Sequence, residues 1–241
     1  MGILTVQSKQ LSAGQRTILT RDGWLSLQSL DFQDSFLALG TVKQFEAGYC
    51  LYALDSQVSH VYGLIDGQID VHLLSSTFEE IAFPSTGRGK WYSFSDAITG
   101  DRTAGTAILK TQSTMFCIPR AKFLTFLDVD PTHYRAIISH DNILRRHIQR
   151  VLMDALTGSE VERVVIRLQA LVDGQNTDVG TSLKLTQTEL AAMAGVSLPT
   201  VQRTFRLLKK FEAVETTYGE IQITDREKLS QLQDSLEQSK G

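Results

Sequence analysis

One segment constrains the fold of this chain more than any other. It is TQTELAAMAGVSLPTVQRTFRLLKKF, residues 186–211. Thr186 and Glu189 have the spacing of a capping box, in which each side chain caps a backbone N–H of the other, so a helix is expected to begin there. Gly195 permits a tight turn, and Ser197 followed by Pro199 is typical of the start of a second helix. Two short helices joined in this way form a helix-turn-helix.

The second of these helices is predicted to have two unlike faces. Val201, Phe205, Leu208 and Phe211 recur at helical spacing and are expected to face the core. The segment 197–211 contains no acidic residue, although the whole chain has a net charge of −3. Its basic residues are Arg203, Arg206, Lys209 and Lys210. The outer face therefore has the local positive charge that DNA binding requires.

The side chains of this outer face also suit base recognition. Arginine can donate two parallel hydrogen bonds to guanine, and glutamine can pair with adenine in the same way, so Arg203 and Gln202 are the candidate base readers. Leu198 and Pro199 could touch a thymine methyl group. The residues expected to contact phosphates are Thr188, Ser197, Thr200, Arg206 and Lys209. For any one of these side chains, the alternative is a solvated helix face.

Short runs of alternating apolar and polar residues predict β-structure in two parts of the chain, one before and one after the helix-turn-helix. Residues 42–119 break into β-branched and aromatic runs separated by turn residues, which is typical of an all-β barrel. Within them, Asp66-Gly67 lies between two such runs and predicts a tight hairpin. A short helix is expected before the barrel, in residues 23–40. After the helix-turn-helix, two runs around Tyr218-Gly219 predict a hairpin wing.

A long helix is predicted between the barrel and the helix-turn-helix. Asp130 and Pro131 are start signals and Gly158 is a stop signal, which gives about 27 residues. Two seven-residue series on it are typical of a coiled-coil seam between two chains. They consist of Ile137, Asp141, Leu144, Ile148, Val151 and Ala155. The alternative is a helix packed on its own barrel. Ser159 and Glu162 form a further capping box and predict a second helix directly after it.

Several classes of protein are excluded or disfavoured by what the chain lacks. No apolar run is long enough to span a membrane, and the N-terminus lacks the apolar centre of a secretory signal, so a cytoplasmic protein is expected. Cys50 and Cys117 are too few for a disulfide scaffold, a four-thiolate zinc site or an iron–sulfur cluster, and a redox role for either needs a stabilised thiolate. The histidines His133, His140 and His147 are expected to form a partly exposed stripe beside the seam. We therefore expect no metal site and no enzyme; a metal enzyme built in the barrel is the weaker alternative.

The order of these parts resembles the CRP/FNR family of bacterial transcription regulators. The residues that carry the resemblance are VYGLIDGQIDV, DRTAGTAILKTQSTMFCIPRAKF and QTELAAMAGVSLPTVQRTFRLLKK. It implies an α+β fold with a cyclic-nucleotide-binding-like, antiparallel effector-sensing β-roll in residues 1–128, a dimerisation helix in 129–158 and a winged helix-turn-helix in 159–241. It also implies a homodimer that binds a palindromic operator in double-stranded DNA, with a base contact from Arg203. RNA polymerase and a small-molecule effector are further partners that it implies.

The expected effector site departs from the pattern of family members that bind cyclic nucleotides. Those members carry Phe-Gly-Glu and then, after a short helix, Arg-Ser or Arg-Thr. This chain keeps Arg102-Thr103, and its spacing places Tyr92-Ser93-Phe94 on the first element; an alternative alignment places Phe94-Ser95-Asp96 there. Under the first, the carboxylate that would hold a ribose hydroxyl is absent, which argues against cyclic AMP. The effector is left unknown, Arg102 could equally be a structural arginine, and a constitutive regulator whose barrel binds no effector is an alternative.

Overall fold

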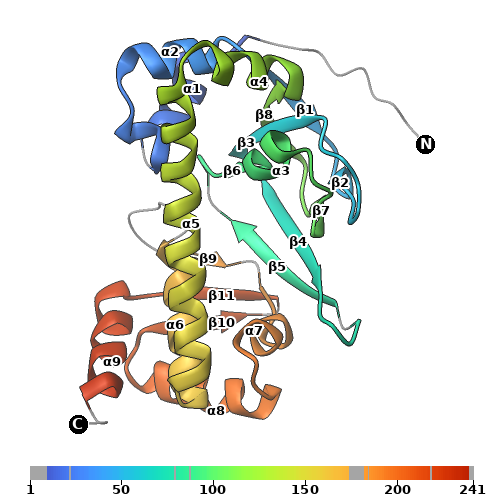
Figure 1. Cartoon of the computed structure of the whole chain (residues 1–241). Helices are drawn as coiled ribbons and strands as arrows, with labels where there is room; N and C mark the ends of the chain where they lie inside the picture. Colours follow the sequence, from blue (N-terminus) through green and yellow to red (C-terminus); the bar gives the residue numbers. More distant parts are fainter. Residues whose placement is uncertain are drawn as a thin grey trace. The chain divides into compact units, whose positions relative to one another are not determined.

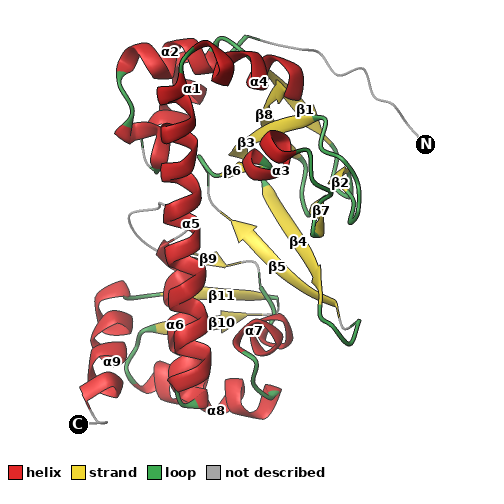
Figure 2. Ribbon diagram, viewed as in Figure 1, coloured by secondary structure: helices red, strands yellow, loops and turns green. Residues whose placement is uncertain are grey.

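The computed structural model describes residues 10–21, 23–78, 80–86, 88–173, 182–183, 185–217 and 219–238. The chain divides into two compact units, residues 1–146 and 147–241, which are described separately below (Figure 1). Antiparallel sheets with flanking helices make up the first unit, and helices with a small sheet make up the second (Figure 2). This confirms the α+β fold class. Among the helices of the described residues, none is long and apolar enough to cross a membrane.

Two four-stranded antiparallel sheets form the β-roll of the first unit. One has the strand order β1-β8-β3-β6 and the other β2-β7-β4-β5. The strands of the first sheet are Thr41–Phe45 (β1), Ser113–Pro119 (β8), His60–Asp66 (β3) and Trp91–Tyr92 (β6). Those of the second are Cys50–Tyr52 (β2), Gly105–Leu109 (β7), Gln68–Leu74 (β4) and Glu80–Thr86 (β5). The prediction of an all-β region over residues 42–119 is confirmed, apart from one short helix within it.

The predicted hairpin at Asp66-Gly67 is wrong. β3 pairs with β8 and β6, whereas β4 pairs with β5 and β7, so the chain passes from one sheet to the other at Gly67. Gly67 has a φ of 112°, and a Cβ atom there would lie 2.1 Å from Ser113 Oγ. Glycine is therefore required at a sheet-to-sheet corner, which the local sequence cannot distinguish from a hairpin turn because both need a residue with positive φ.

Helices that precede, interrupt and follow the strands of the β-roll in sequence contribute to an aromatic core. The helices are Ala13–Thr20 (α1), the 3₁₀ turn Trp24–Leu27 (η1), Leu30–Leu37 (α2), Phe94–Thr99 (α3) and Arg120–Val129 (α4). Trp24 contacts Phe36, Phe94 and Trp91 edge-on, with ring centroids 5.2 to 6.2 Å apart. The helix expected in residues 23–40 is present as η1 and α2. α1, α3 and α4 were not predicted from the sequence.

The long helix α5, Pro131–Thr157, has the predicted 27 residues. Asp130 Oδ1 accepts a 2.8 Å hydrogen bond from the Thr132 N–H, as expected of a residue that caps the helix. The predicted seam residues are not equivalent, however. Ile137 is only 1% exposed in the core of the first unit, and Asp141 Oδ2 accepts a 2.7 Å hydrogen bond from Ser95 of α3. The start of α5 therefore packs on its own β-roll, although Ile138 is 63% exposed, and most of the exposed apolar side chains of α5 lie in its later part.

The second unit consists of helices packed on a three-stranded sheet of order β10-β11-β9. Its helices are Glu160–Asp173 (α6), Gln187–Ala194 (α7), Leu198–Lys210 (α8) and Arg226–Gln238 (α9), and its strands are Ser182–Leu183 (β9), Val214–Thr217 (β10) and Glu220–Ile223 (β11). Val164, Val165 and Leu168 of α6 meet Val201, Phe205 and Leu208 of α8 in one core. The capping box at the start of α6 is confirmed, since Ser159 N–H donates to Glu162 Oε2 and Glu162 N–H donates to Ser159 Oγ.

Candidate nucleic-acid interface

The two helices of the motif, α7 and α8, begin at the predicted residues, and α7 ends at the predicted glycine. Thr186 and Glu189 form the capping box of α7, with Thr186 N–H donating to Glu189 Oε2 at 2.7 Å. Gly195 ends α7 with a φ of 60°. Ser197 caps α8 by accepting a hydrogen bond from Thr200 N–H, and a proline lies in the first turn. The helix-turn-helix is therefore confirmed. The hydrogen bonds that cap its two helices join residues three apart in the chain.

A side chain of α6 holds the turn between the two helices. Arg163 Nε donates to the Ala194 carbonyl and its Nη2 donates to the Gly195 carbonyl, both at 3.2 Å. Its Nη1 donates to the Gly158 carbonyl at 3.3 Å. The Ala194 and Gly195 carbonyls lie at the end of α7, where the last carbonyls of a helix have no partner within the helix. Arg163 therefore links α6 to the turn between α7 and α8.

The inner face of α8 carries most of the predicted core residues. Val201, Phe205 and Leu208 are buried, but Phe211 is 49% exposed, so its assignment to the core is wrong. The helix ends at Lys210, and Phe211 is its C-cap residue, which takes the side chain away from the helical repeat. Thr204, a polar residue on this face, is fully buried and its Oγ1 donates to the Thr200 carbonyl at 2.9 Å. A hydroxyl that is satisfied within its own helix can be buried at little cost.

The outer face of α8 presents polar and basic side chains to solvent. The expected DNA-contacting residues that are exposed are Thr188, Ser197, Leu198, Pro199, Gln202, Arg203, Arg206 and Lys209. Thr200 differs, because it is only 4% exposed and its hydroxyl donates to Glu160 Oε2 at 2.8 Å. Its side chain therefore has no exposed hydroxyl for a phosphate, which does not support the expected contact. Arg203 Nη2 lies 3.5 Å from the same Glu160 oxygen.

Glu160 lies at the site although the sequence did not point to it. It is the first residue of α6 and lies 43 residues before Arg203 in the chain. Acidic residues are common in the first turn of helices, where they interact favourably with the helix dipole. The only local signal, an acid at a helix start, therefore has an ordinary explanation. The contact of Glu160 with Thr200 and Arg203 depends on how α6 packs against α8, and this packing cannot be predicted from the sequence pattern of either helix.

The wing lies next to the end of α8. β10 and β11 pair antiparallel from Val214–Ile223 to Thr217–Glu220, which confirms the hairpin; Tyr218, expected in its turn, lies outside the described residues. Lys209 Nζ donates to Thr216 Oγ1 of β10 at 2.6 Å. The side chain of Lys209 thus joins the last turn of α8 to the wing, and it places a positive charge at the junction of the two elements.

In the first unit, the residues expected to bind an effector make contacts within the protein. Arg102 Nη1 donates to the Asp55 carbonyl at 2.5 Å and lies 3.4 Å from Asp55 Oδ2. Thr103 is buried, and its Oγ1 donates to the Ala53 carbonyl and accepts from the Ser56 N–H. Arg102 thus has a partner within the protein, as expected if it is a structural arginine and does not bind an effector. Both side chains tie the start of β7 to the loop after β2.

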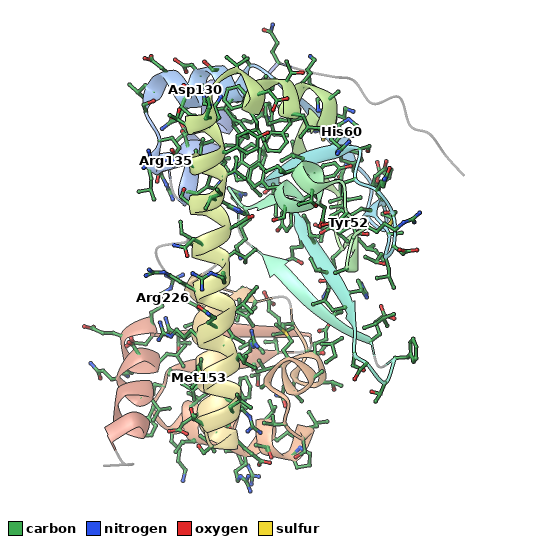
Figure 3. The ribbon with its side chains drawn as sticks, viewed as in Figure 1. Tyr52, His60, Asp130, Arg135, Met153 and Arg226 are labelled. Atoms are coloured by element: carbon green, nitrogen blue, oxygen red, sulfur yellow. The ribbon has the colours of Figure 1, made fainter. Side chains whose placement is uncertain are left out.

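Tyr92 and Ser93 lie at the end of β6 and the start of α3. Ser93 has a φ of 73°, the left-handed region that ordinarily favours glycine. This supports the alignment that places Ser93 on the family's glycine, and Phe94, the next residue, is buried in the core instead of offering a carboxylate. Nearby Tyr52 (Figure 3) has its pKa raised to about 12, mainly by burial and also by the charge of Asp96. The phenol is therefore neutral at physiological pH.

The histidines and cysteines of the described residues do not assemble a metal site. No group of three or more His, Cys, Asp or Glu side chains in the described part could hold a metal ion. His133 and His140 are partly exposed, as expected, and each also packs on an aromatic ring: His133 stacks on Phe126 at 3.9 Å and His140 contacts Phe94 edge-on at 4.9 Å. The side chain of His147 lies outside those described. Cys50 is exposed, whereas Cys117 is buried, and burial raises its pKa to about 12.

Residues 162–232 match the family of Crp-like helix-turn-helix domains. No curated protein matches the chain. Among solved structures, the chain is similar to a Ruegeria pomeroyi protein described as cyclic nucleotide binding, with 18% identity, a TM-score of 0.68, and coverage of 92% of this chain and 97% of that one. It is also similar to FixK2 from Bradyrhizobium japonicum, with 16% identity, a TM-score of 0.67, and coverage of 80% and 96%.

A third similar structure is TTHA1359 from Thermus thermophilus, a transcriptional regulator of the CRP/FNR family. It has 20% identity and a TM-score of 0.61, with coverage of 81% of this chain and 99% of that one. At these identities the structures show a shared fold, while the domain match identifies the helix-turn-helix that occupies the second unit. Together with the capped helices α7 and α8, the domain match identifies residues 162–232 as a Crp-like helix-turn-helix domain, and the two-sheet β-roll belongs to the fold that the chain shares with these structures.

Proposed function

We propose that the chain is a homodimeric, sequence-specific DNA-binding transcription regulator that does not respond to cyclic AMP, with residues 159–241 as its DNA-binding domain. The observation that carries the proposal is the division of α8 into two faces. Val201, Phe205 and Leu208 hold one face in the core, so Gln202 and Arg203 are held on the exposed face. A helix fixed on one side and basic on the other can enter the major groove.

Each exposed side chain has a distinct part in this interaction. Arg203 and Gln202 contact base edges and determine sequence, since their side chains can form paired hydrogen bonds with guanine and adenine. Arg206 and Lys209 contact phosphates, which adds affinity without sequence preference. Ser197, at the N-terminus of α8, adds a phosphate contact where the backbone N–H groups of the helix also point outward. Leu198 and Pro199 supply apolar contact with a thymine methyl group.

The dimer is proposed to form through the later part of α5. Leu144, Ile148, Leu152 and Leu156 are spaced by four residues, and their exposed fractions lie between 48% and 71%. Residues four apart lie on one side of a helix, so these leucines and isoleucine form an apolar stripe. Met153, also exposed, lies on the same helix (Figure 3). Pairing of two such stripes removes them from water, and the two α8 helices would then bind half-sites about 34–36 Å apart or a multiple of that distance.

The proposal that cyclic AMP is not the effector rests on the contacts of the effector segment. Thr103 uses its hydroxyl on Ala53 and Ser56, and Arg102 is directed to Asp55. Phe94, which the favoured alignment places on the family's glutamate, is buried in the aromatic core. A ribose hydroxyl would therefore lack its carboxylate partner, which costs about 1–3 kcal/mol for a buried unsatisfied group. The same contacts support a second candidate, a constitutive regulator whose β-roll binds no effector.

The test is selection of bound sequences from a random pool of DNA duplexes, once without ligand and once with cyclic AMP. The cyclic AMP concentration is about 1 mM, which is about a thousandfold above the Kd of a ligand that binds with micromolar affinity. We expect an enriched palindrome in both arms with the same affinity. Arg203→Ala should relax specificity at one base pair per half-site and cost about 1–3 kcal/mol. Enrichment only with cyclic AMP would refute the effector proposal, and unchanged sequence preference in Arg203→Ala would refute the proposed docking of α8.

The dimer is tested by sedimentation of Ile148→Asp, in which a charge is placed in the middle of the stripe. We expect a shift from dimer to monomer, because an unpaired carboxylate is costly to bury between helices. Val129→Asp is the matched control, since Val129 is an exposed apolar residue at the end of α4 and outside the stripe. A dimer that persists in Ile148→Asp, or dissociates equally in both variants, would refute an interface formed by the stripe.

A further inference from the structure

Glu160 connects a buried residue of α8 to the exposed arginine of the same helix. Thr200 Oγ1 donates a 2.8 Å hydrogen bond to Glu160 Oε2, and Arg203 Nη2 donates to the same oxygen at 3.5 Å. Thr200 and Arg203 are three residues apart and therefore neighbours on the helix surface. One carboxylate oxygen of α6 thus contacts two successive turns of the helix that is proposed to read DNA.

The hydrogen bond from Thr200 holds the Glu160 carboxylate more firmly than the longer contact with Arg203 does. The hydroxyl of Thr200 has a single hydrogen to donate and uses it on Glu160, so in its 3.0 Å contact with Ser197 Oγ the serine must be the donor. Ser197 Oγ in turn accepts from the Thr200 N–H and caps α8. The position of Glu160 is therefore set by the N-terminal turn of α8 itself, through a chain of hydrogen bonds.

The contact with Arg203 is weaker and can be rearranged. The side chains of Arg203 and Glu160 are 64% and 52% exposed, and at 3.5 Å the hydrogen bond is long. An exposed ion pair of this kind contributes little to the stability of the fold. Its effect is on the conformations of Arg203, because a fixed negative charge beside one Nη atom favours the rotamers that keep the guanidinium there. The remaining N–H groups stay available as donors, and two of them suffice for a guanine.

We propose that Glu160 is a positioning residue for base recognition by Arg203: the carboxylate, fixed by Thr200, orients the guanidinium before DNA binds. The inference rests on the proposed function, since it requires Arg203 to contact a base. It assigns to α6 a part in specificity, through the contact of Glu160 with Arg203. Orientation in advance lowers the entropy that Arg203 loses on binding. The same carboxylate repels phosphates and thereby weakens binding to DNA of any sequence.

This role predicts two effects of opposite sign when Glu160 is replaced. In Glu160→Ala, discrimination at the base pair read by Arg203 should fall at least threefold, while affinity for unrelated DNA should rise because a negative charge is lost. Glu160→Gln keeps an oxygen that can accept from Thr200, so it should preserve the fold and show a smaller loss of discrimination. The control is Glu227→Ala, which removes an exposed acid from the first turn of α9 in the same unit. It should leave discrimination unchanged at every position.

The experiment measures the Kd of the full-length protein for the selected palindrome and for duplexes with each half-site base pair changed in turn, at one salt concentration. We expect Glu160→Ala and Arg203→Ala to lose discrimination at the same base pair, and the double variant to lose no more there than Arg203→Ala alone. Unchanged discrimination in Glu160→Ala, or a uniform loss at all positions, would overturn the inference. If Glu160→Ala is unfolded by circular dichroism, Glu160→Gln decides by the same criterion.

The failures of the two proposals can be told apart in the same data. If Arg203→Ala leaves every base preference unchanged, the proposed docking of α8 is wrong and Glu160 has no base contact to support. If Arg203→Ala relaxes one base pair and neither Glu160 variant does, the docking is supported and only the positioning role is wrong. In either case the variants must keep the thermal unfolding midpoint of the parent protein, so that a change in affinity reports on DNA binding.

Discussion

Ser95 Oγ donates a 2.7 Å hydrogen bond to Asp141 Oδ2 and so joins α3 of the β-roll to α5. The other carboxylate oxygen, Oδ1, lies 3.1 Å from His140 Nδ1. His140 itself packs edge-on against Trp24 and Phe94. Asp141 was expected at a seam between two chains. In the structure it is instead one of the residues that attach the beginning of the long helix to the helix that follows Ser93.

Asp141 should make the stability of the first unit depend on pH in the acidic range. Burial raises the pKa of its carboxyl, but the hydrogen bonds from His140 and Ser95 outweigh this and hold the pKa below its ordinary value. A carboxyl with a lowered pKa stabilises the fold above its unfolded pKa of about 3.9, and this stabilisation is lost as the pH falls through the folded pKa. In urea unfolding, the difference between the parent protein and Asp141→Asn should therefore be larger at about pH 6 than at pH 3. An equal difference at both values would contradict this role.

Gly67 should tolerate no side chain, whereas Gly14 should accept one. Gly67→Ala places a Cβ atom 2.1 Å from Ser113 Oγ at a φ of 112°, so we expect a loss of more than about 1 kcal/mol in unfolding free energy. Gly14 lies within α1 and has no atom within 4 Å of a built Cβ, so Gly14→Ala should stabilise by about 0.5–1 kcal/mol. Urea unfolding of both variants is the measurement. Equal effects would mean that the corner between β3 and β4 is not as tight as described.

The two cysteines should differ in their reaction with a thiol reagent. The thiolate is the reactive form, and burial raises the pKa of Cys117 to about 12 although Lys43 opposes the shift. Cys50 is exposed. At neutral pH we expect one thiol to react in the folded protein and two in guanidinium, with the fast reaction absent in Cys50→Ser. Rapid labelling of Cys117 in the folded state would show that its strand opens readily.

Lys209 should contribute to DNA affinity without contributing to sequence preference. Its Nζ lies 2.6 Å from Thr216 Oγ1, at the junction of α8 and the wing. Lys209→Ala should weaken binding to all duplexes alike and reduce the slope of log K against log salt by about one. Lys228→Ala is the control, because that lysine is paired with Glu212 at 2.8 Å. A changed base preference in Lys209→Ala would show that the lysine contacts a base edge.

Much of the helical structure could be predicted because its signals are local. The capping boxes of α6 and α7, the Ser197 cap of α8 and the start of α5 at Pro131 all depend on residues two to four apart. A side chain and a backbone group at such a separation meet as soon as one helical turn forms, whatever the rest of the chain does. The same holds for the apolar face of α8, which the helical repeat determines up to its last turn.

The site itself could be predicted only in part. The exposed positions of Gln202, Arg203 and Arg206 follow from the spacing of the buried residues around them. The burial of Thr200 does not, because a threonine in the first turn of a helix is equally compatible with solvent. Its partner Glu160 lies 40 residues away in the chain. Likewise, Arg102 and its partner Asp55 are 47 residues apart, so the sequence left two roles open for that arginine.

The capped helices, the two faces of α8, the β-rich character of residues 42–119 and the resemblance of the motifs to CRP/FNR regulators could all be inferred from the sequence. The assignment of β3 and β4 to different sheets, the packing of Ile137 on its own β-roll and the contact between Glu160 and Arg203 depend on tertiary contacts. The two groups of features differ in the range of the interactions that form them. Caps and helical repeats are satisfied within one turn, whereas strand pairing, burial and ion pairs between helices depend on segments that meet only when the whole unit has folded.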